Sequence, residues 1–250
     1  MIDVHCHLEQ KDYNEDRDSV IKECRKHMKA LITSCAHYND LELSVEIAKN
    51  HKGFVFLCLG LHPEFIKDLD KERTKQYIQE IIKNKSHIFA IGEIGLDYFW
   101  IKDHEWQEKQ KEMFIEFISL AKKLNLPAII HSRDAMNDTL DILEKQGMKG
   151  KKVLMHLFGA KEFLPRIIEN GWSISIGPLI LKNKEIRKIA RDCPLKNIML
   201  ETDSPWFGDG KRGMPTNVIK VCEKIAEMKK LSKEAVEKQT DLNAKEFFKI

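Results

Sequence analysis

The sequence lacks the features that mark several large classes of protein. No run of about 18 consecutive apolar residues is present, so no segment is expected to span a membrane. The first residues, Met-Ile-Asp-Val-His, include an acid and no long apolar stretch, and so do not look like a secretion signal. Low-complexity segments and linkers rich in Ser, Gly or Pro are also missing. We therefore expect a cytoplasmic protein that forms one domain over residues 1–250.

Two familiar motifs are absent as well. The six cysteines never occur with C-x-x-C spacing, which excludes a zinc ribbon and a thioredoxin-like redox site. Most of them lie in apolar stretches, as in Leu57-Cys58-Leu59, where a reduced cysteine packs as a small hydrophobic residue. Neither G-x-G-x-x-G nor a Walker sequence occurs, and the nearest candidate, Gly92-Glu93-Ile94-Gly95, has the wrong spacing. A Gly-rich phosphate loop is therefore not expected.

The chain also has almost no excess of either charge. Lys and Arg number 42 and Asp and Glu number 39, which gives a formal net charge of +3. Such a small excess neither requires nor excludes a nucleic-acid partner, and any affinity for phosphate has to be local. It argues against a long footprint on duplex and favours capture of a strand end or a short strand.

What the chain does contain is a regular alternation of short apolar runs and longer amphipathic runs. The apolar runs are mostly continuous, as in strands buried on both faces of a parallel sheet. They predict strands over Ile2–His5, Ala30–Cys35, Phe54–Leu59, Ile88–Glu93, Ala128–His131, Val153–His156, Ser173–Ile176 and Asn197–Glu201. The amphipathic runs predict helices over Asp18–His27, Asp40–Asn50, Glu72–Lys83, Glu105–Leu124, Met136–Gln146, Lys161–Asn170, Lys184–Arg191, Asn217–Met228 and Lys233–Phe248.

Eight strands that are each followed by a helix indicate an α/β fold, a single (β/α)8 TIM barrel. The length of 250 residues is typical of this barrel. A doubly wound open sheet is the competing architecture, but it usually carries the Gly-rich phosphate loop that is missing from this sequence.

The ten histidines are unevenly placed, and half of them lie where predicted strands end. The active sites of such barrels lie at the carboxyl ends of the strands, so polar residues there are expected to converge. The residues in question are His5, His7, His62, Glu93, His131, His156 and Asp203. Four other histidines, at positions 27, 51, 87 and 104, fall on or beside helices and are assigned to the surface or to packing, while His37 stays open.

The spacing of these residues indicates a metal site. Residues i and i+2 of a strand point to the same side, so His5 and His7 are expected to ligate one ion, with Cys6 turned aside. Imidazoles mixed with carboxylates suit Zn²⁺ or Mn²⁺ and tolerate Mg²⁺. Such an ion lowers the pKa of bound water from about 15.7 to about 7, and two ions about 4 Å apart clamp both reacting oxygens of a phosphodiester. Glu93 lies between the two sets of histidines and is expected to bridge the pair.

Six segments in this order resemble the TatD family of metal-dependent deoxyribonucleases, within the amidohydrolase-like metal hydrolases. The resemblance runs over nearly the whole chain. The matching segments are Asp3-Val4-His5-Cys6-His7-Leu8, Gly60-Leu61-His62-Pro63, Ala90-Ile91-Gly92-Glu93-Ile94-Gly95-Leu96-Asp97-Tyr98, Pro127-Ala128-Ile129-Ile130-His131-Ser132-Arg133-Asp134-Ala135, Met155-His156-Leu157-Phe158-Gly159 and Leu200-Glu201-Thr202-Asp203-Ser204-Pro205.

The resemblance implies a (β/α)8 barrel with one or two divalent metal ions as cofactors, Mg²⁺, Mn²⁺ or Zn²⁺. It implies that one ion is held by His5, His7, Glu93 and Asp203, and the other by Glu93, His131 and His156. Asp203 is also expected to orient or deprotonate the attacking water, so Asp203 and Glu93 are the candidate catalytic residues. The implied activity is hydrolysis of DNA, including 3′-to-5′ exonuclease action on single strands, and we expect a monomer.

Three features depart from the family pattern and concern the substrate rather than the metals. After the sixth strand the family usually has His-Cys-Phe-Ser/Thr-Gly, whereas this chain has His156-Leu157-Phe158-Gly159, one residue fewer. After the eighth strand the usual Arg-Asn-x-Pro is replaced by Lys211-Arg212-Gly213-Met214-Pro215-Thr216-Asn217. The chain is also slightly short for the family.

Three residues near the predicted strand ends are candidate substrate-binding residues: His62, Arg133 and Tyr98. His62 alternatively caps a turn, and Arg133 alternatively pairs with Asp134 or Asp97. The aromatic residues at positions 98, 99, 100 and 106 are expected either to stack on unpaired bases or to pack against the following helix. Lys211 and Arg212 are further candidates, or part of a solvated loop.

Two other functions stay open. One is a metal hydrolase of the same architecture that cleaves a small-molecule ester, lactone or phosphotriester. The absence of a carboxylatable lysine at the end of the fourth strand argues against it. The other is a non-catalytic barrel that only binds nucleic acid or metal, but an inert relative would be free to lose the water-activating acid, Asp203.

Overall fold

The computed structural model describes residues 1–250 and contains eight strands and nine α-helices in alternating order. The strands are β1 Ile2–Cys6, β2 Ala30–Cys35, β3 Val55–Leu59, β4 Ile88–Asp97, β5 Ala128–Arg133, β6 Val153–Met155, β7 Ser173–Ile176 and β8 Ile198–Leu200. The helices are α1 Arg17–His27, α2 Leu41–Asn50, α3 Lys71–Lys83, α4 His104–Leu124, α5 Met136–Lys145, α6 Leu164–Glu169, α7 Lys184–Asp192, α8 Val218–Lys229 and α9 Lys233–Phe248.

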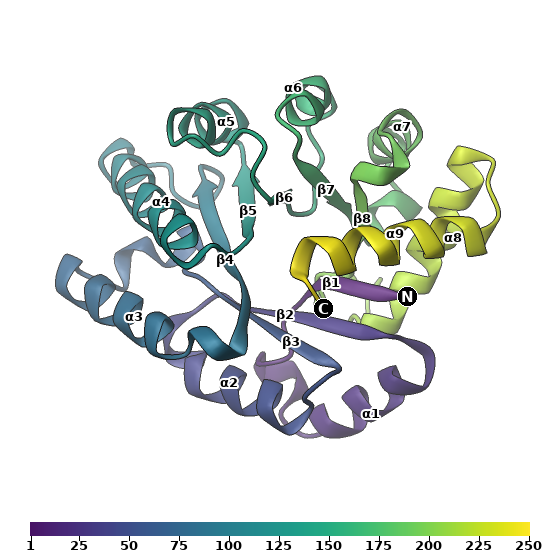
Figure 1. Cartoon of the computed structure of the whole chain (residues 1–250), viewed down its shortest axis with the longest axis horizontal. Helices are drawn as coiled ribbons and strands as arrows, with labels where there is room; N and C mark the ends of the chain where they lie inside the picture. Colours follow the sequence, from purple (N-terminus) through teal and green to yellow (C-terminus); the bar gives the residue numbers. More distant parts are fainter.

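All eight strands are parallel and follow one another around a nearly closed barrel, with helices outside (Figure 1). The (β/α)8 barrel predicted from the sequence is confirmed. No helix of the molecule is both long enough and apolar enough to cross a bilayer.

The seam between β1 and β8 is closed by individual hydrogen bonds instead of a regular ladder. Asp203 N donates to the carbonyl oxygen of His5 at 2.9 Å, and His7 N donates to that of Ser204 at 2.8 Å. The buried carboxylate of Asp3 accepts from Thr202 N at 3.0 Å and from Thr202 Oγ1 at 2.5 Å. Residues from the two ends of the chain are therefore joined beside the barrel mouth.

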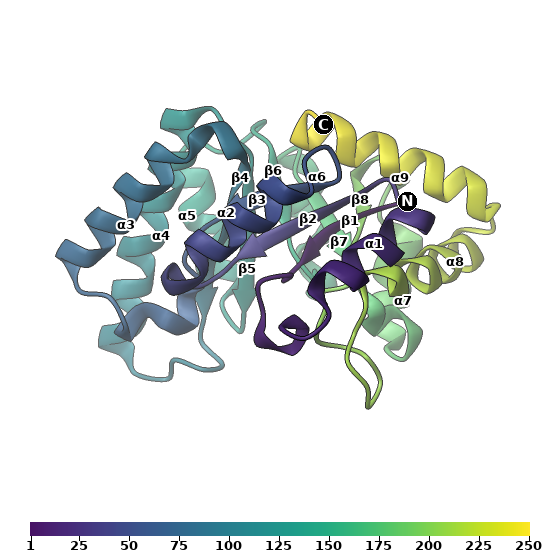
Figure 2. The same ribbon diagram turned by 90° about the horizontal axis from the view of Figure 1, so that it is seen from below.

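The molecule has two hydrophobic cores. The outer core, of 62 buried residues, fills the layer between strands and helices. The inner core, of 12 residues, fills the barrel with strand residues of mixed size, from Ala30 and Ala90 to Met199, together with Ala244, Phe247 and Phe248 of α9. Helix α9 thus packs across the end of the barrel where the strands begin (Figure 2).

Two irregularities in strand pairing change which residues face the barrel interior. Against β2, the register of β1 shifts between Asp3 and Cys6, and against β5 that of β4 shifts between Ile91 and Ile94. As a result Val4 belongs to the inner core but Cys6 to the outer one, and Ala90 is inner but Ile94 outer. In strict alternation the members of each pair would share a face. Extra residues at these points turn His5 and Glu93 inward, as β-bulges beside active sites commonly do.

Several element boundaries differ from the predicted ones. Strand β4 continues four residues past Glu93 to Asp97, because Gly95 allows close approach to β5: its φ is +149°, and a Cβ there would overlap the carbonyl oxygen of His131. The predicted helix Lys161–Asn170 is divided into a 3-10 turn, Lys161–Phe163, and α6. Pro165 lacks the N–H that would continue a helix and instead lies in the first turn of α6.

Candidate metal centre

The first half of the centre is formed by residues at the ends of β1 and β8. His5 Nε2 and His7 Nε2 are 3.0 Å apart. Asp203 Oδ1 lies 3.2 Å from His7 Nε2, and Glu93 Oε2 lies 3.2 Å from His5 Nε2. Cys6 points away, with its Sγ directed at the carbonyl oxygen of Ile32. The side-by-side arrangement of His5 and His7 expected from their spacing is therefore present.

The second half surrounds the other carboxylate oxygen of Glu93. His131 Nδ1 is 2.7 Å from Glu93 Oε1, and His62 Nε2 is 3.6 Å from it. His156 lies between the halves, because its Nε2 is 3.7 Å from Glu93 Oε1 and 3.8 Å from Asp203 Oδ1. The two oxygens of Glu93 thus face different sets of imidazoles, as a bridging carboxylate requires.

Each of four histidines uses its second ring nitrogen to contact an orienting group. His7 Nδ1 is 3.3 Å from Glu9 Oε1, His156 Nδ1 is 2.8 Å from Glu201 Oε2, and His131 Nε2 is 2.9 Å from Asp97 Oδ2. His5 Nδ1 is 3.3 Å from Ser34 Oγ. An ionised carboxylate only accepts hydrogen bonds, so it holds a proton on one ring nitrogen and leaves the other free to ligate a metal.

The orienting roles of Glu9, Asp97 and Glu201 were not predicted from the sequence. A signal was available for two of them, since Asp97 and Glu201 lie within the motifs at strand ends and a buried carboxylate needs a partner. Glu9 is only two residues from His7, but it lies beyond the predicted strand Ile2–His5, so the strand prediction did not include it.

His62 is bonded in the opposite way from the other histidines. Its Nδ1 accepts a hydrogen bond from Glu64 N at 3.2 Å, so it also caps the 3-10 turn Pro63–Lys67. In the neutral ring the proton is then on Nε2, which faces His131 and Glu93. His62, Asp97 and His131 bring potential ligand atoms within 4.8 Å of one another. Because His62 presents an N–H and Asp97 is occupied by His131, this trio is a hydrogen-bonded group, not a third metal site.

The charges of the centre are strongly coupled. Burial by itself raises the pKa of Glu93, but His156, His62 and His5 outweigh it and hold that pKa well below its usual value. Burial likewise opposes ionisation of Asp203, yet His156 and His7 lower its pKa. Both carboxylates are therefore ionised at neutral pH.

The histidines respond to the same carboxylates. Burial tends to lower the pKa of His156, but Glu201, Glu93 and Asp203 raise it to about 10. For His62, burial and the neighbouring His131 lower the pKa to about 3, so this ring is neutral. A buried set of imidazoles and ionised carboxylates with fixed orientation is a donor set that fits divalent cations.

Comparison with known proteins agrees with this donor set. The family described as TatD related DNase matches residues 2–249. The chain belongs to the TatD-related DNase family. Among curated TatD-family relatives, human deoxyribonuclease TATDN3 is 35% identical, with 99% of this chain and 94% of the human protein covered. The Bacillus subtilis metal-dependent hydrolase YabD is 32% identical, with 100% of this chain and 99% of YabD covered.

Solved TatD structures share the fold. The TatD-family hydrolase of Entamoeba histolytica superimposes with a TM-score of 0.91 at 22% identity, covering 99% of this chain and 97% of that one. The TatD homologue YJJV of Escherichia coli also gives 0.91, at 23% identity, covering 100% and 98%.

Some residues of this TatD-family chain that were predicted to bind substrate contact other protein groups instead. The Tyr98 hydroxyl donates to Asp138 Oδ2 at 2.7 Å, so the structure does not bring it to the metal centre. Arg133 is exposed and makes neither of the predicted ion pairs; its guanidinium lies 3.7 Å from the ring centroid of Phe99. Arg212 is not free in a solvated loop, since it binds both carboxylate oxygens of Asp16 at 2.7 and 2.6 Å.

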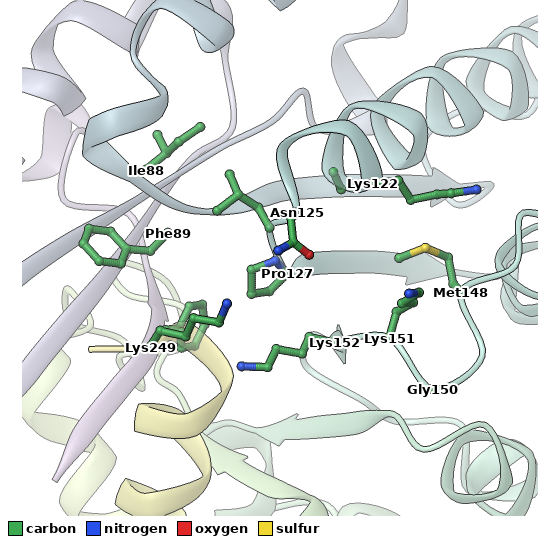
Figure 3. Close-up of a pocket in the computed structure, with 13 residues that line it drawn as sticks. Ile88, Phe89, Lys122, Asn125, Pro127, Met148, Gly150, Lys151, Lys152 and Lys249 are labelled. Carbon is green, nitrogen blue, oxygen red and sulfur yellow. The ribbon is translucent and has the colours of Figure 1, made fainter.

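A cavity of about 540 Å³ lies at the opposite end of the TatD-type barrel (Figure 3). It is lined by the starts of β4 and β5 and by the end of α9. Two of its four lysines are already bonded to main-chain carbonyls: Lys122 to Gln146, and Lys152 to Glu246 and Phe247. These contacts join the lysines to the ends of α5 and α9, and none of the residues that line the cavity belongs to the metal centre.

Proposed function

We propose that this chain is a metal-dependent deoxyribonuclease that hydrolyses phosphodiester bonds at the 3′ end of single-stranded DNA. The observation that carries the proposal is Glu93, whose two oxygens each face a separate set of imidazoles at the open end of the barrel. The proposed metal ligands are His5, His7, Glu93, His131, His156 and Asp203. One or two ions of Mg²⁺, Mn²⁺ or Zn²⁺ held there supply positive charge and lower the pKa of a water molecule.

The chain's own residues perform the remaining work. Asp203 is ionised and lies at the rim of the first half, where it orients the attacking water and accepts its proton. Glu93 fixes the separation of the two halves. His62 is neutral and directs Nε2–H into the second half, where it donates a hydrogen bond to a phosphate oxygen.

The cellular setting is also proposed. All six cysteines are free and buried, which is compatible with a reducing cytoplasm. We propose that the protein acts there as a monomer and as a single domain.

The test is an assay on single-stranded DNA labelled at its 5′ end, with each metal supplied separately. The wild type is expected to shorten the strand from its 3′ end, and Asp203→Ala and Glu93→Ala to lose nearly all activity. Glu246→Ala, which removes an exposed carboxylate on α9, is the control and should match the wild type. Equal activity in all four proteins would mean that another site or a contaminant cleaves the DNA. Turnover of lactones or phosphotriesters with no action on DNA would favour the alternative hydrolase.

A further inference from the structure

Exposed aromatic side chains gather at the open end of the barrel. Phe99 and Trp100 follow β4, Trp206 and Phe207 follow β8, and each side chain is between 39% and 56% exposed. Soluble proteins rarely leave large aromatic groups exposed together unless that surface binds a partner. The aromatic residues after β8 were not singled out in the sequence analysis.

The two aromatic pairs lie on opposite sides of the metal centre. In a ring of eight strands taken in order, β4 and β8 are half a turn apart, so the loops that follow them face each other across the mouth. We call Phe99 and Trp100 the β4 platform, and Trp206 and Phe207 the β8 platform.

Each platform is attached to one half of the centre. The ring of Trp206 packs edge-on against His7, with centroids 4.7 Å apart. On the other side, Asp97 Oδ1 accepts hydrogen bonds from Phe99 N at 2.9 Å and Trp100 N at 2.8 Å, while its Oδ2 contacts His131. The groups that position the two metal-binding halves therefore also position the two platforms.

The β4 platform carries a positive charge. Arg133 lies with its guanidinium carbon 3.7 Å from the Phe99 centroid and 5.6 Å from that of Trp100. A stacked guanidinium beside an exposed ring offers one group for a phosphate and another for a base. The loop that carries the β8 platform is held in place, because Arg212 of this loop donates hydrogen bonds to both carboxylate oxygens of Asp16, which precedes α1.

We propose that the two platforms bind the bases on either side of the scissile phosphate, one base on each platform. This inference rests on the proposed deoxyribonuclease function and deepens it. Bases held on opposite sides of the mouth cannot stack on each other, so the arrangement selects single strands and frayed ends by geometry. Stacking on one aromatic platform is expected to change affinity by about 5- to 150-fold per base.

The test uses short single strands in which one nucleotide, either 5′ or 3′ of the cleaved phosphate, is replaced by an abasic tetrahydrofuran unit. In the wild type each replacement should raise KM about tenfold and change kcat little. Trp206→Ala should stop responding to the replacement at one position, and Trp100→Ala at the other. Trp206→Phe should keep the response, and Leu242→Ala, an exposed residue of α9, should behave as wild type. If both alanine variants still respond at both positions, or both lose the same position, the proposal is wrong.

A second measurement separates this inference from the proposed function. Asp203→Asn with Mg²⁺ and a short oligothymidylate reports binding without cleavage through tryptophan fluorescence, since Trp100 and Trp206 are exposed, Trp106 is half-buried and Trp172 is fully buried. Quenching that falls when either exposed tryptophan is changed to Phe supports the platforms even if the wild type never cleaves DNA. Cleavage of DNA without any quenching or abasic effect would overturn the platforms and leave the nuclease proposal intact.

Discussion

The two halves of the metal centre differ in depth. In the first half the side chains of His5 and His7 are 0% and 2% exposed, whereas in the second half those of His131 and His62 are 16% and 13% exposed. A closed set of ligands holds an ion permanently, while an open set keeps positions for water or substrate. The difference indicates that the histidines of the first half are closed to the substrate and those at β3 and β5 are open to it, while Asp203, 11% exposed, leaves the first half accessible to water.

The halves also differ in how the chain assembles them. The first half joins β1 to the segment after β8, from opposite ends of the sequence. The second half draws on the ends of β3, β4 and β5, which are neighbours both in sequence order and in the sheet. Glu93 belongs to both, and His156, which follows β6, lies between them.

Replacing Glu93, the carboxylate shared by the two halves, should lower the nuclease rate more than any other change. Glu93→Gln keeps the shape of the side chain but loses the charge that faces both halves, so kcat/KM on single-stranded DNA should fall on the order of 10³-fold. The matched variant Glu246→Gln should leave the rate unchanged. A loss of less than tenfold in Glu93→Gln would show that the halves do not depend on a common carboxylate.

Replacing an orienting carboxylate should weaken metal binding in one half of the centre only. Asp97→Asn is expected to lower the affinity for metal about 10- to 100-fold in the second half, and Glu9→Gln to do the same in the first. Metal titration followed by calorimetry should show two binding steps, with a different step displaced in each variant. Displacement of the same step by both changes would contradict the separation into halves.

Metal binding should become tighter as pH rises. Burial opposes protonation of His7 and His131, but Asp203 and Glu9 raise the pKa of His7, and Asp97 and Glu93 raise that of His131. These rings carry protons in the metal-free protein, and a ligand nitrogen must lose its proton, so affinity should rise about tenfold per pH unit for each proton released. Calorimetry in two buffers with different ionisation enthalpies measures that number, and a value of zero would contradict the charge assignment.

The same shifts predict the opposite trend for the metal-free fold. The pKa of His156 is raised to about 10 by its carboxylate neighbours, above the usual value of about 6.5. Its contribution to stability is therefore fully present below about pH 6.5 and is lost as pH rises through about 10. Thermal unfolding of the metal-free protein at pH 6.5 and 9.5 should show the lower Tm at the higher pH, and the reverse order would show that His156 is neutral when folded.

The smallest effect is expected at the opposite end of the barrel. Lys152→Met removes the hydrogen bonds to the end of α9 and should cost about 1 kcal/mol, or a few degrees in Tm, with no change in kcat. Lys151→Met, in the same cavity, is the control because the Lys151 amine makes no hydrogen bond within the protein. A loss of nuclease rate in Lys152→Met would show that the two ends of the barrel are coupled.

The sequence was sufficient to predict the fold and the convergence of polar residues at one end of the barrel, because both depend on local patterns. Continuous apolar runs indicate parallel strands, and polar residues at their carboxyl ends converge whenever the strands close into a barrel. His5, His131 and Asp203 were found in this way.

Other features depend on contacts between distant segments and could not be read locally. The irregular pairing that turns Glu93 inward depends on the register between β4 and β5, which a continuous apolar run does not reveal. The bonding of Arg212 to Asp16 and of Tyr98 to Asp138 joins loops to other elements, and no spacing along the chain indicates either pair.

The seam between β1 and β8 has a consequence for how the molecule unfolds. An ion bound by His5, His7 and Asp203 would act as a non-covalent cross-link that closes a loop of about 200 residues, and cross-links over long loops restrict the unfolded chain most. Chelation would release that cross-link at the one place where the sheet has no continuous ladder. Amide hydrogens of β1 and β8 would then exchange faster than those of β3 to β5. Unfolding of the barrel would begin with the separation of β1 from β8.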